Sequence, residues 1–339
     1  MGRRPIIAID AMGGDRAPAA IVEGALRSIA EADVDVLLVG DHDAMRDFLP
    51  VGDLPSGLEV VTCSQTIAMD ADPASSVRTL RDSSIVRCAE AVRDGRADAF
   101  VGAGNTGATM AASLLRFGRI KGVARPAIAV PIPVPASKVR QLLVDGGATV
   151  DPEPAWLVQW AKLGQAYAQV RFGMDAPTVG LLSNGEEAGK GDQLRKAAFG
   201  LFETEVAQFV GNVEGRDLAR VSADVIVTDG FTGNVALKTL EGAMMAMAGL
   251  VFGVLDEPEF VEHSMPLKLR LLEAAGDLMP DQTGGALLLG VEGVCIISHG
   301  SSSADAIVNA TRVARSCVVN DIVTKLRDAV HIGGVERAS

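Results

Sequence analysis

Short apolar runs rich in Val, Ile and Leu recur along the chain, and most of them end abruptly at Gly, Asp, Asn or Ser. A longer stretch with the apolar spacing of a helix then follows, which is the rhythm of alternating strands and helices. Several runs are apolar without alternation, as in strands buried on both faces of a parallel sheet. The pattern predicts strands at Ile6–Ala11, Val34–Val39, Leu58–Cys63, Ala97–Gly102, Ala127–Ile132, Gln141–Asp145, Thr178–Ser183, Val206–Gly211, Ala223–Thr228 and Val294–Ser298.

The same spacing predicts helices between and after these strands, at Ala17–Ala32, Ser76–Arg93, Thr106–Phe117, Pro154–Phe172, Lys190–Phe202, a long Met-rich one from Asn234, and one from Asp305 to about Val330. This alternation predicts an α/β fold with three layers, α/β/α, around a mainly parallel sheet. We expect residues 1–339 to form a single large domain with a helical excursion at about 234–280. In such a sheet the loops after the strands gather at one edge, so we expect the polar loops to converge.

Charge and cysteine usage narrow the range of functions. The formal net charge is −12 and the sequence has no Lys/Arg cluster, which argues against nucleic acid, because nucleic-acid affinity comes largely from neutralising phosphates. An anionic membrane surface would repel the chain on average for the same reason. The four cysteines are far apart and lack metal or redox spacing. We therefore expect a reducing, cytosolic compartment and cysteines that pack as small core residues.

No segment predicts export or a membrane span. The apolar run near the start lasts four residues and ends at Asp10, which is too short for a secretory leader. The longest uncharged apolar stretch, Gly242–Leu255, is shorter than the roughly 20 residues that a spanning helix needs. We therefore expect that the chain does not cross a membrane.

The clearest motif is GAGNTGA, from Gly102 to Ala108, which follows a predicted strand and opens a predicted helix. The backbone N–H groups of such a loop and the dipole of the helix behind it bind anions. The motif also matches the dinucleotide fingerprint, but it follows the fourth strand, and residues 121–135 contain no acidic side chain for a ribose. We expect phosphate rather than NAD here; a purely structural glycine turn is the alternative.

A second motif, GEEAGKG from Gly185, resembles a Walker A loop that is one residue short. Gly191 stands where Ser or Thr should bind magnesium, so an ATPase is not expected. Lys190 could hold an anionic ligand at the start of a helix. The alternative is a surface ion pair with Glu186 or Glu187.

Three other loops, IDAMGGD, TDGFTGN and SHGSSS, start at Ile9, Thr228 and Ser298. Each carries acceptors, donors and flexible backbone, and each could equally be a capped turn. His299 beside serines invites a hydrolase hypothesis, but the chain has no GxSxG elbow, and neighbours in sequence are poor evidence for a catalytic triad. No ligand spacing indicates a metal, and we expect no metal and no cofactor.

The order of the motifs along one chain is more specific than any one of them. Taken together over about Ile6–Val330, they resemble the bacterial phosphate acyltransferase (PlsX) family; the matching segments are IAIDAMGGDRAP, DSSIVRCAEAV, GAGNTGATMAA, LLVDGGATVDPEP, GLLSNGEEAGKG, VGNVEGRDL, VTDGFTGNVALKTLEG and GGALLLGVEGVCIISHGSS. The resemblance implies transfer of an acyl group from acyl carrier protein (ACP) to inorganic phosphate. The acyl phosphate would begin the route to phosphatidic acid in phospholipid synthesis. It also implies a homodimer with a fold similar to isocitrate and isopropylmalate dehydrogenases.

The reaction that the resemblance implies sets the demands on the site. Phosphate is already a nucleophile and a thioester is already activated, so the site must orient two anionic reactants and stabilise an oxyanion rather than supply a strong base. We expect Lys190 and Asn234 to stabilise the oxyanion or phosphate, with Asp229 and His299 orienting their neighbours. The expected phosphate-binding residues are Gly104, Asn105, Thr106 and Gly107. Further candidates for substrate binding are Asp10, Gly13, Gly14, Arg78, Ser83, Ser84 and Glu186.

The resemblance also implies partners. They are ACP as the acyl donor, a second copy of the chain, and a membrane glycerol-3-phosphate acyltransferase (PlsY-type) that uses the product. From these partners we expect a cytoplasmic enzyme that associates peripherally with the membrane. The Met-rich helix, with Met244, Met245 and Met247, packs in a core or dimer if it behaves like most all-round apolar helices. Contact with lipid is the alternative.

Three rival functions remain open from the sequence. A phosphotransacetylase would use acyl-coenzyme A, which a comparison of ACP and coenzyme A thioesters would reveal. An NAD-dependent decarboxylating dehydrogenase of similar fold would bind NAD in a titration. A non-catalytic module of lipid synthesis would bind acyl-ACP without turnover.

Overall fold

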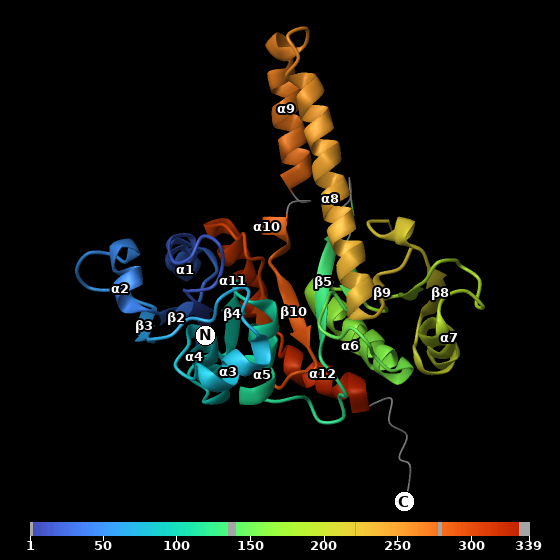
Figure 1. Ribbon diagram of the computed structural model, residues 1–339, viewed down its shortest axis with the longest axis horizontal. Coiled ribbons are helices and arrows are strands. Elements are labelled where there is room, and N and C mark those ends of the chain that lie inside the picture. The colour runs from blue at the N-terminus through green and yellow to red at the C-terminus, as the bar shows by residue number, and fades with distance from the viewer. Residues whose placement is uncertain (1–2, 135–139, 221, 277–279, 332–339) are drawn as a thin grey trace, which may run out of the picture.

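The computed structural model describes residues 3–134, 140–220, 222–276 and 280–331. Its strands form one sheet in the order β3-β2-β1-β4-β11-β10-β5-β6-β9-β7-β8 (Figure 1). The strands are β1 (Ile6–Asp10), β2 (Asp35–Gly40), β3 (Leu58–Thr62), β4 (Ala99–Gly102), β5 (Ala127–Pro133), β6 (Arg140–Val144), β7 (Val179–Leu182), β8 (Phe209–Val213), β9 (Val225–Val227), β10 (Ala286–Leu289) and β11 (Val294–Ile297). Every predicted strand is present, and β10 is an additional one.

The helices are α1 (Ala19–Glu31), α2 (His42–Met45), α3 (Pro73–Thr79), α4 (Ser84–Arg93), α5 (Thr106–Arg116), α6 (Pro154–Phe172), α7 (Gln193–Glu205), α8 (Gly230–Leu255), α9 (Val261–Gly276), α10 (Pro280–Thr283), α11 (Ala304–Val319) and α12 (Ile322–His331). Two predicted helices are each broken in two. The first breaks between α3 and α4, where Leu80 leaves the helical conformation with a ψ of 65°. The second breaks at Asp321, whose φ of 49° is left-handed.

Alternate side chains of the strands enter two different cores, which makes the three layers. Ile7 and Ile9 belong to the core on one face of the sheet, with Trp160 and Tyr167 of α6 fully buried there. Ala8, between them, faces the other core. Helices α1, α6, α11 and α12 pack against one another in one outer layer, and α3, α4 and α5 in the other. The predicted α/β/α fold is therefore confirmed.

The middle of the sheet reverses direction, which the sequence did not predict. Strand β10 is antiparallel to both β11 and β5, and β5 is antiparallel to β6, whereas the other neighbours are parallel. Three successive reversals leave β6, β7, β8 and β9 running opposite to β1, β4 and β11. The expectation that all polar loops gather at one edge is therefore wrong. The two reversals at β10 cancel, so β5 runs in the same direction as β11, and the antiparallel β5–β6 pair turns the remaining strands around.

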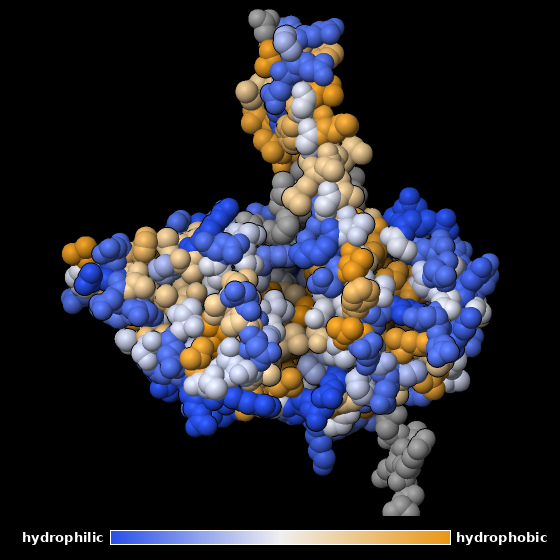
Figure 2. Space-filling view, in the orientation of Figure 1, coloured by the Kyte–Doolittle hydropathy of each residue, from blue (hydrophilic) through white to orange (hydrophobic). Residues whose placement is uncertain are grey.

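Helices α8 and α9 form an arm that projects from the body (Figure 1), at the place of the predicted excursion. Among the residues of α8, only Gly230, Gly233 and Leu237 are buried. The outer part carries exposed apolar side chains, which appear orange along its sides in Figure 2, beside a strip of blue and white polar residues. By length and composition alone α8 could span a membrane, because the helix of 26 residues extends well beyond the uncharged stretch Gly242–Leu255. Residues 277–279 of the predicted excursion lie outside the described residues.

Candidate functional site

Three predicted loops meet where β1, β4 and β11 end. A Cβ atom placed on Gly13 would lie 2.6 Å from the backbone nitrogen of Gly104, so the two loops touch through their backbones. The backbone N–H of Asp15 donates to the carbonyl oxygen of Gly300 at 2.7 Å. Gly14 has a φ of +108°, which favours glycine at this turn. We call these contacts the Gly13–Gly104 cluster.

A buried polar group lies behind this cluster. Asp10 is 1% exposed, and its Oδ1 accepts from the backbone N–H of Met12 at 3.0 Å. Its Oδ2 and the hydroxyls of Ser83 and Ser84 are buried without a hydrogen-bond partner among the described residues. Burial raises the pKa of Asp10, because the charged form loses solvation. Asp10, Ser83 and Ser84 therefore support the glycine loops from beneath rather than form an open surface.

The side chain of Asn105 is already committed within the GAGNTGA loop. Its amide nitrogen donates to three backbone carbonyls within residues 68–71 at 3.0 to 3.2 Å. Its Oδ1 caps α5 by accepting from the backbone N–H of Ala108 at 3.0 Å. Thr106 is exposed and Gly107 half-buried in the first turn, where backbone N–H groups have no partner within the helix. An anion at this loop would therefore meet backbone donors rather than the Asn105 side chain.

A second cluster forms where β6 and β9 end. The side-chain amide of Asn234 donates to the carbonyl oxygen of Gly146 at 3.3 Å. A Cβ atom on Gly147, whose φ is +136°, would lie 3.1 Å from the same amide nitrogen. Asn234 lies in the second turn of α8 rather than at its start, because Asp229 begins the helix by accepting from the N–H of Thr232 at 2.8 Å.

Asp145 anchors this second cluster and was not among the candidates from the sequence. Its carboxylate is fully buried and accepts backbone N–H groups at 2.7 to 3.0 Å from Ile128, Gly147, Ala148 and Thr149. Burial raises the pKa of Asp145 to about 6, although these four donors favour the charged form. The signal that could have found it is an acidic residue directly after the apolar run Leu142–Val144.

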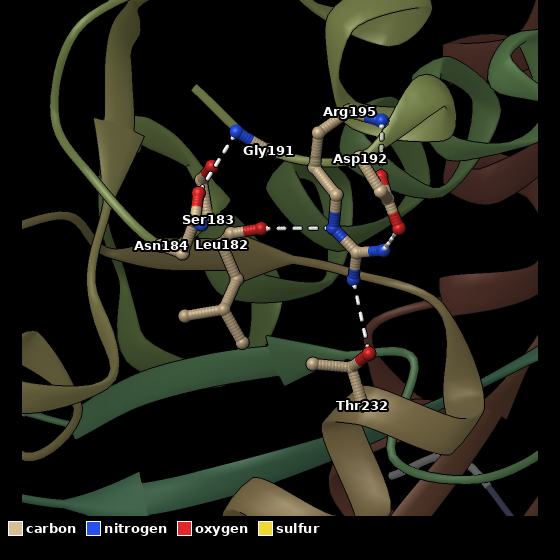
Figure 3. Close-up of a pocket in the computed structure, with 7 residues that line it drawn as sticks. All are labelled: Leu182, Ser183, Asn184, Gly191, Asp192, Arg195 and Thr232. Carbon is tan, nitrogen blue, oxygen red and sulfur yellow. Dashed lines mark hydrogen bonds and ion pairs between the residues drawn. The ribbon is translucent and has the colours of Figure 1, made fainter.

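Arg195 is the other residue that the sequence candidates missed. Its buried guanidinium bonds Asp192 through Nη1 at 2.7 Å and Asp229 through Nη2, and these two aspartates cap α7 and α8 (Figure 3 shows the Asp192 bond). The same Nη2 donates to the hydroxyls of Thr228 and Thr232 at 2.8 and 3.1 Å. Burial opposes ionisation of Asp229, but the bonds from Thr232 and Arg195 hold its pKa below the ordinary value. Arg195 therefore joins the starts of two helices.

A cavity of about 320 Å³ opens beside this guanidinium (Figure 3). Its walls come from the end of β7, the GEEAGKG loop and the first turn of α8; the lining residues are Leu182, Ser183, Asn184, Gly191, Asp192, Arg195 and Thr232. Lys190 is exposed next to this wall, in the loop before α7 rather than in the helix, because α7 begins after its cap Asp192. The alternative pairing of Lys190 with Glu186 is not seen, since Glu186 pairs with Arg216 at 3.0 Å.

Helix α8 connects the two clusters. His299 Nε2, in the loop after β11, lies 3.8 Å from Glu241 Oε1 on α8. Glu241 follows Asn234 by seven residues, which is about 10 Å along a helix. Asn234 and Asp229, and the loop of Lys190, therefore lie near the start of α8. His299 and the Gly13–Gly104 cluster lie about two turns further along α8, near Glu241.

Two groups of candidate residues lie outside both clusters. Arg78 is exposed on α3 and lines a separate pocket. All four cysteines are free and buried, and burial raises the pKa of Cys63 to about 11 and those of Cys295 and Cys317 to about 12. The prediction that the cysteines are core residues is confirmed.

Comparison with known proteins agrees with the fold and identifies the family. The model of the family described as "Fatty acid synthesis protein" matches residues 6–325. A phosphate acyltransferase from Desulfitobacterium hafniense (strain Y51) is 45% identical over 95% of this chain and 96% of its own length. One from Elusimicrobium minutum (strain Pei191) is 44% identical over 96% of this chain and 95% of its own.

Solved structures share the fold at low sequence identity. A phosphotransacetylase from Streptococcus pyogenes superposes with a TM-score of 0.63 at 16% identity, covering 94% of this chain and 95% of that one. A 4-hydroxythreonine-4-phosphate dehydrogenase from Klebsiella pneumoniae gives a TM-score of 0.51 at 11% identity, covering 92% and 98%. With a family model over most of the chain and relatives near 45% identity over nearly all of it, this chain belongs to the fatty acid synthesis protein family that includes the phosphate acyltransferases.

Proposed function

We propose that the protein transfers an acyl group from acyl-ACP to inorganic phosphate, releasing acyl phosphate and free ACP. The observation that carries the proposal is near-complete alignment with relatives named phosphate acyltransferase. The geometry suits the chemistry, because both clusters offer hydrogen-bond donors and helix N-termini for anions rather than a strong base. The oxygen of phosphate attacks the thioester carbonyl, the carbon–sulfur bond breaks, and the thiol of ACP leaves.

We assign the oxyanion to the cluster at the start of α8. Asn234 is held by Gly146 and presents its amide there. Lys190 forms no ion pair with the described residues, so its flexible ammonium is free to approach developing negative charge. Asp229 orients this cluster as the cap of α8. Asp229 is an orienting residue here and does not itself contact the reacting atoms.

We assign phosphate to the backbone N–H groups of the GAGNTGA loop, with Gly104, Thr106 and Gly107 as donors. The Asn105 side chain shapes this loop, because its hydrogen bonds go to other backbone groups. His299 lies at the edge of this cluster and faces Glu241 of α8. Reacting atoms must approach within about 3–3.5 Å, so phosphate and carbonyl would meet between the clusters, along the first turns of α8.

The α8–α9 arm is assigned to a second copy of the chain and to the membrane surface. Met245, Met247 and Leu250 are 61–70% exposed, and Leu269 on α9 is 56% exposed. Covering such side chains stabilises an assembly by about 1.5–3 kcal/mol for each one that becomes fully buried. A homodimer would cover one face of the arm and leave its tip for lipid. The enzyme would then be cytoplasmic and peripherally membrane-associated, and would pass acyl phosphate to a membrane glycerol-3-phosphate acyltransferase.

Phosphate dependence tests this function directly. Thioester in acyl-ACP should disappear only when inorganic phosphate is present, with acyl phosphate formed in equal amount. Consumption without phosphate would indicate a hydrolase, and binding without consumption would indicate a non-catalytic module. Faster turnover of acyl-coenzyme A than of acyl-ACP would favour a phosphotransacetylase instead.

A further inference from the structure

The fold gathers positive charge on one side of an acidic protein. Residues 73–126 contain nine Lys or Arg and four Asp or Glu, a net charge of +5, so the rest of the chain carries −17. Four arginines from this segment, spread over residues 78–116, line one pocket of about 410 Å³. We call this the arginine surface: Arg78, Arg81, Arg93 and Arg116, with Glu90 and Leu115. The sequence has no contiguous basic cluster, but the fold creates one on the surface.

Much of this charge is not neutralised locally. Arg78 and Arg81 form no ion pair with the described residues. Arg93 pairs with the exposed Asp94 at 2.7 Å. Glu90 lies 3.2 Å from Arg116 and 3.2 Å from Arg87, so a single carboxylate faces two guanidinium groups. The surface therefore keeps a net positive charge.

The arginine surface also includes an exposed apolar side chain. Leu115 lies among the arginines and is 47% exposed. Arginine together with exposed apolar side chains is typical of protein–protein contact sites. Free phosphate or another small anion would not require the exposed leucine.

The Arg78 side of the surface lies near the proposed phosphate loop, whereas Leu115 and Arg116 lie at the opposite end of α5 from that loop. Helix α3 starts at Pro73, whose Cγ would lie 2.6 Å from a Cβ atom on Gly107. Arg78 follows Pro73 by five residues, about 7.5 Å along the helix. In Figure 1 the α8–α9 arm leaves the body at the top, whereas α3 and α5 lie at its lower side. A partner on the arginine surface would therefore lie between about 7 and 15 Å from the loop along α3 and α5, and away from the arm.

We propose that the arginine surface is the docking surface for the carrier protein that delivers the acyl group, and that the carrier presents carboxylates to it. The inference rests on the proposed function, since only a protein-borne thioester needs a protein docking surface. Complementary charge chiefly speeds association and makes it sensitive to salt. Nucleic acid is disfavoured, because the charge of −17 elsewhere repels a polyanion that extends beyond this confined surface.

The test compares two double variants with the same change in charge. R81E/R93E reverses two exposed charges of the arginine surface. R46E/K325E reverses two exposed charges elsewhere and is the matched control. For R81E/R93E the KM for acyl-ACP should rise about tenfold or more with kcat within about twofold, and its KM should lose most of its dependence on NaCl concentration. The control should keep the wild-type values.

Titration with holo-ACP, which carries no acyl group, makes the test independent of turnover. The Kd should rise about tenfold for R81E/R93E and stay constant for R46E/K325E. If wild-type protein shows no phosphate-dependent loss of thioester, the proposed function fails, and the titration still decides the docking surface. An unchanged KM and Kd in R81E/R93E would overturn the docking proposal alone. The docking proposal would also be overturned if R81E/R93E lost binding to duplex DNA or to anionic vesicles but kept its affinity for ACP.

Discussion

The guanidinium of Arg195 bonds Asp229, the residue that caps α8, while also bonding Asp192, the cap of α7. Lys190 lies two residues before one cap, and Asn234 lies five residues after the other. The spacing of the two groups proposed to stabilise the oxyanion thus depends on one buried side chain. Loss of geometry on the scale of 1 Å can lower a rate about a hundredfold.

Arg195→Gln should lower kcat about tenfold or more and change the KM for either substrate little, because Arg195 positions other residues. It should also raise the pKa of Asp229, which Arg195 now helps to hold low. A carboxylate with a lowered pKa favours the folded arrangement above its ordinary pKa, and that contribution is lost as the pH falls through the lowered value. The acid limb of the pH–rate profile should therefore move to higher pH in the variant.

Arg195→Lys should restore part of kcat and move the acid limb back, because it keeps a cation beside Asp229. Arg312→Gln is the matched control, since Arg312 pairs with Glu31 on the surface at 3.1 Å. A pH profile of Arg195→Gln that coincides with the wild-type profile would show that the clamp does not act through Asp229.

Lys190→Ala and Asn234→Ala should each lower kcat by about two orders of magnitude, as expected for loss of a preorganised donor to developing negative charge. Lys190 is exposed, so its removal should leave the thermal unfolding midpoint unchanged. Lys196→Ala, an exposed lysine on α7, is the control and should retain full activity. Near-normal rates in both variants would refute the assigned roles.

Gly13→Ala should separate the first pair of glycine loops, because the added Cβ would lie 2.6 Å from the backbone nitrogen of Gly104. We expect the KM for phosphate to rise about tenfold, and overpacking to destabilise the fold by about 1–3 kcal/mol. Gly200→Ala on α7 meets no atom within 4 Å and should instead stabilise by up to about 1 kcal/mol. Steady-state kinetics and urea unfolding measure both effects; a normal phosphate KM in Gly13→Ala would remove this loop from phosphate binding.

Met247→Asp/Leu250→Asp should weaken self-association and vesicle binding, because both side chains are more than 60% exposed on the arm. Analytical ultracentrifugation and vesicle flotation separate the two roles. Val51→Asp, at a still more exposed apolar position on the body, is the control. An arm variant that stays dimeric and still floats with vesicles would contradict both assignments.

The sequence predicted local structure better than the relation between distant segments. Helix α6 was predicted residue for residue, since Pro154 starts it and Gly173, with a φ of 68°, ends it. Strand β10 was missed because four apolar residues between glycines carry no periodicity. The net reversal in the sheet lies elsewhere, between β5 and β6, and the apolar runs of two predicted strands do not reveal that they pair antiparallel. The loops were therefore expected to share one edge.

For the candidate site, too, the sequence predicted local motifs better than contacts between distant segments. Lys190 lies in the loop after β7, and Asp229 and Asn234 follow the neighbouring strand β9, but Arg195 and Asp145 escaped notice. Arg195 appears as one more charge in an amphipathic helix, and only the fold shows that it is buried against Asp229. Asp145 appears as the end of a strand. Three of its four backbone donors follow it directly in the chain, and the pairing of β5 with β6 supplies the fourth, Ile128.

The order of strands has a consequence for synthesis. Strand β4 is complete once residue 102 has left the ribosome, yet one of its two neighbours, β11, lies at residues 294–297. Helix α11, which packs on α1, follows later still. Until then the nascent chain exposes an unpaired apolar strand edge, a surface prone to aggregation. The first half of this protein can therefore complete its sheet only after β11, near the end of the chain, has been synthesised.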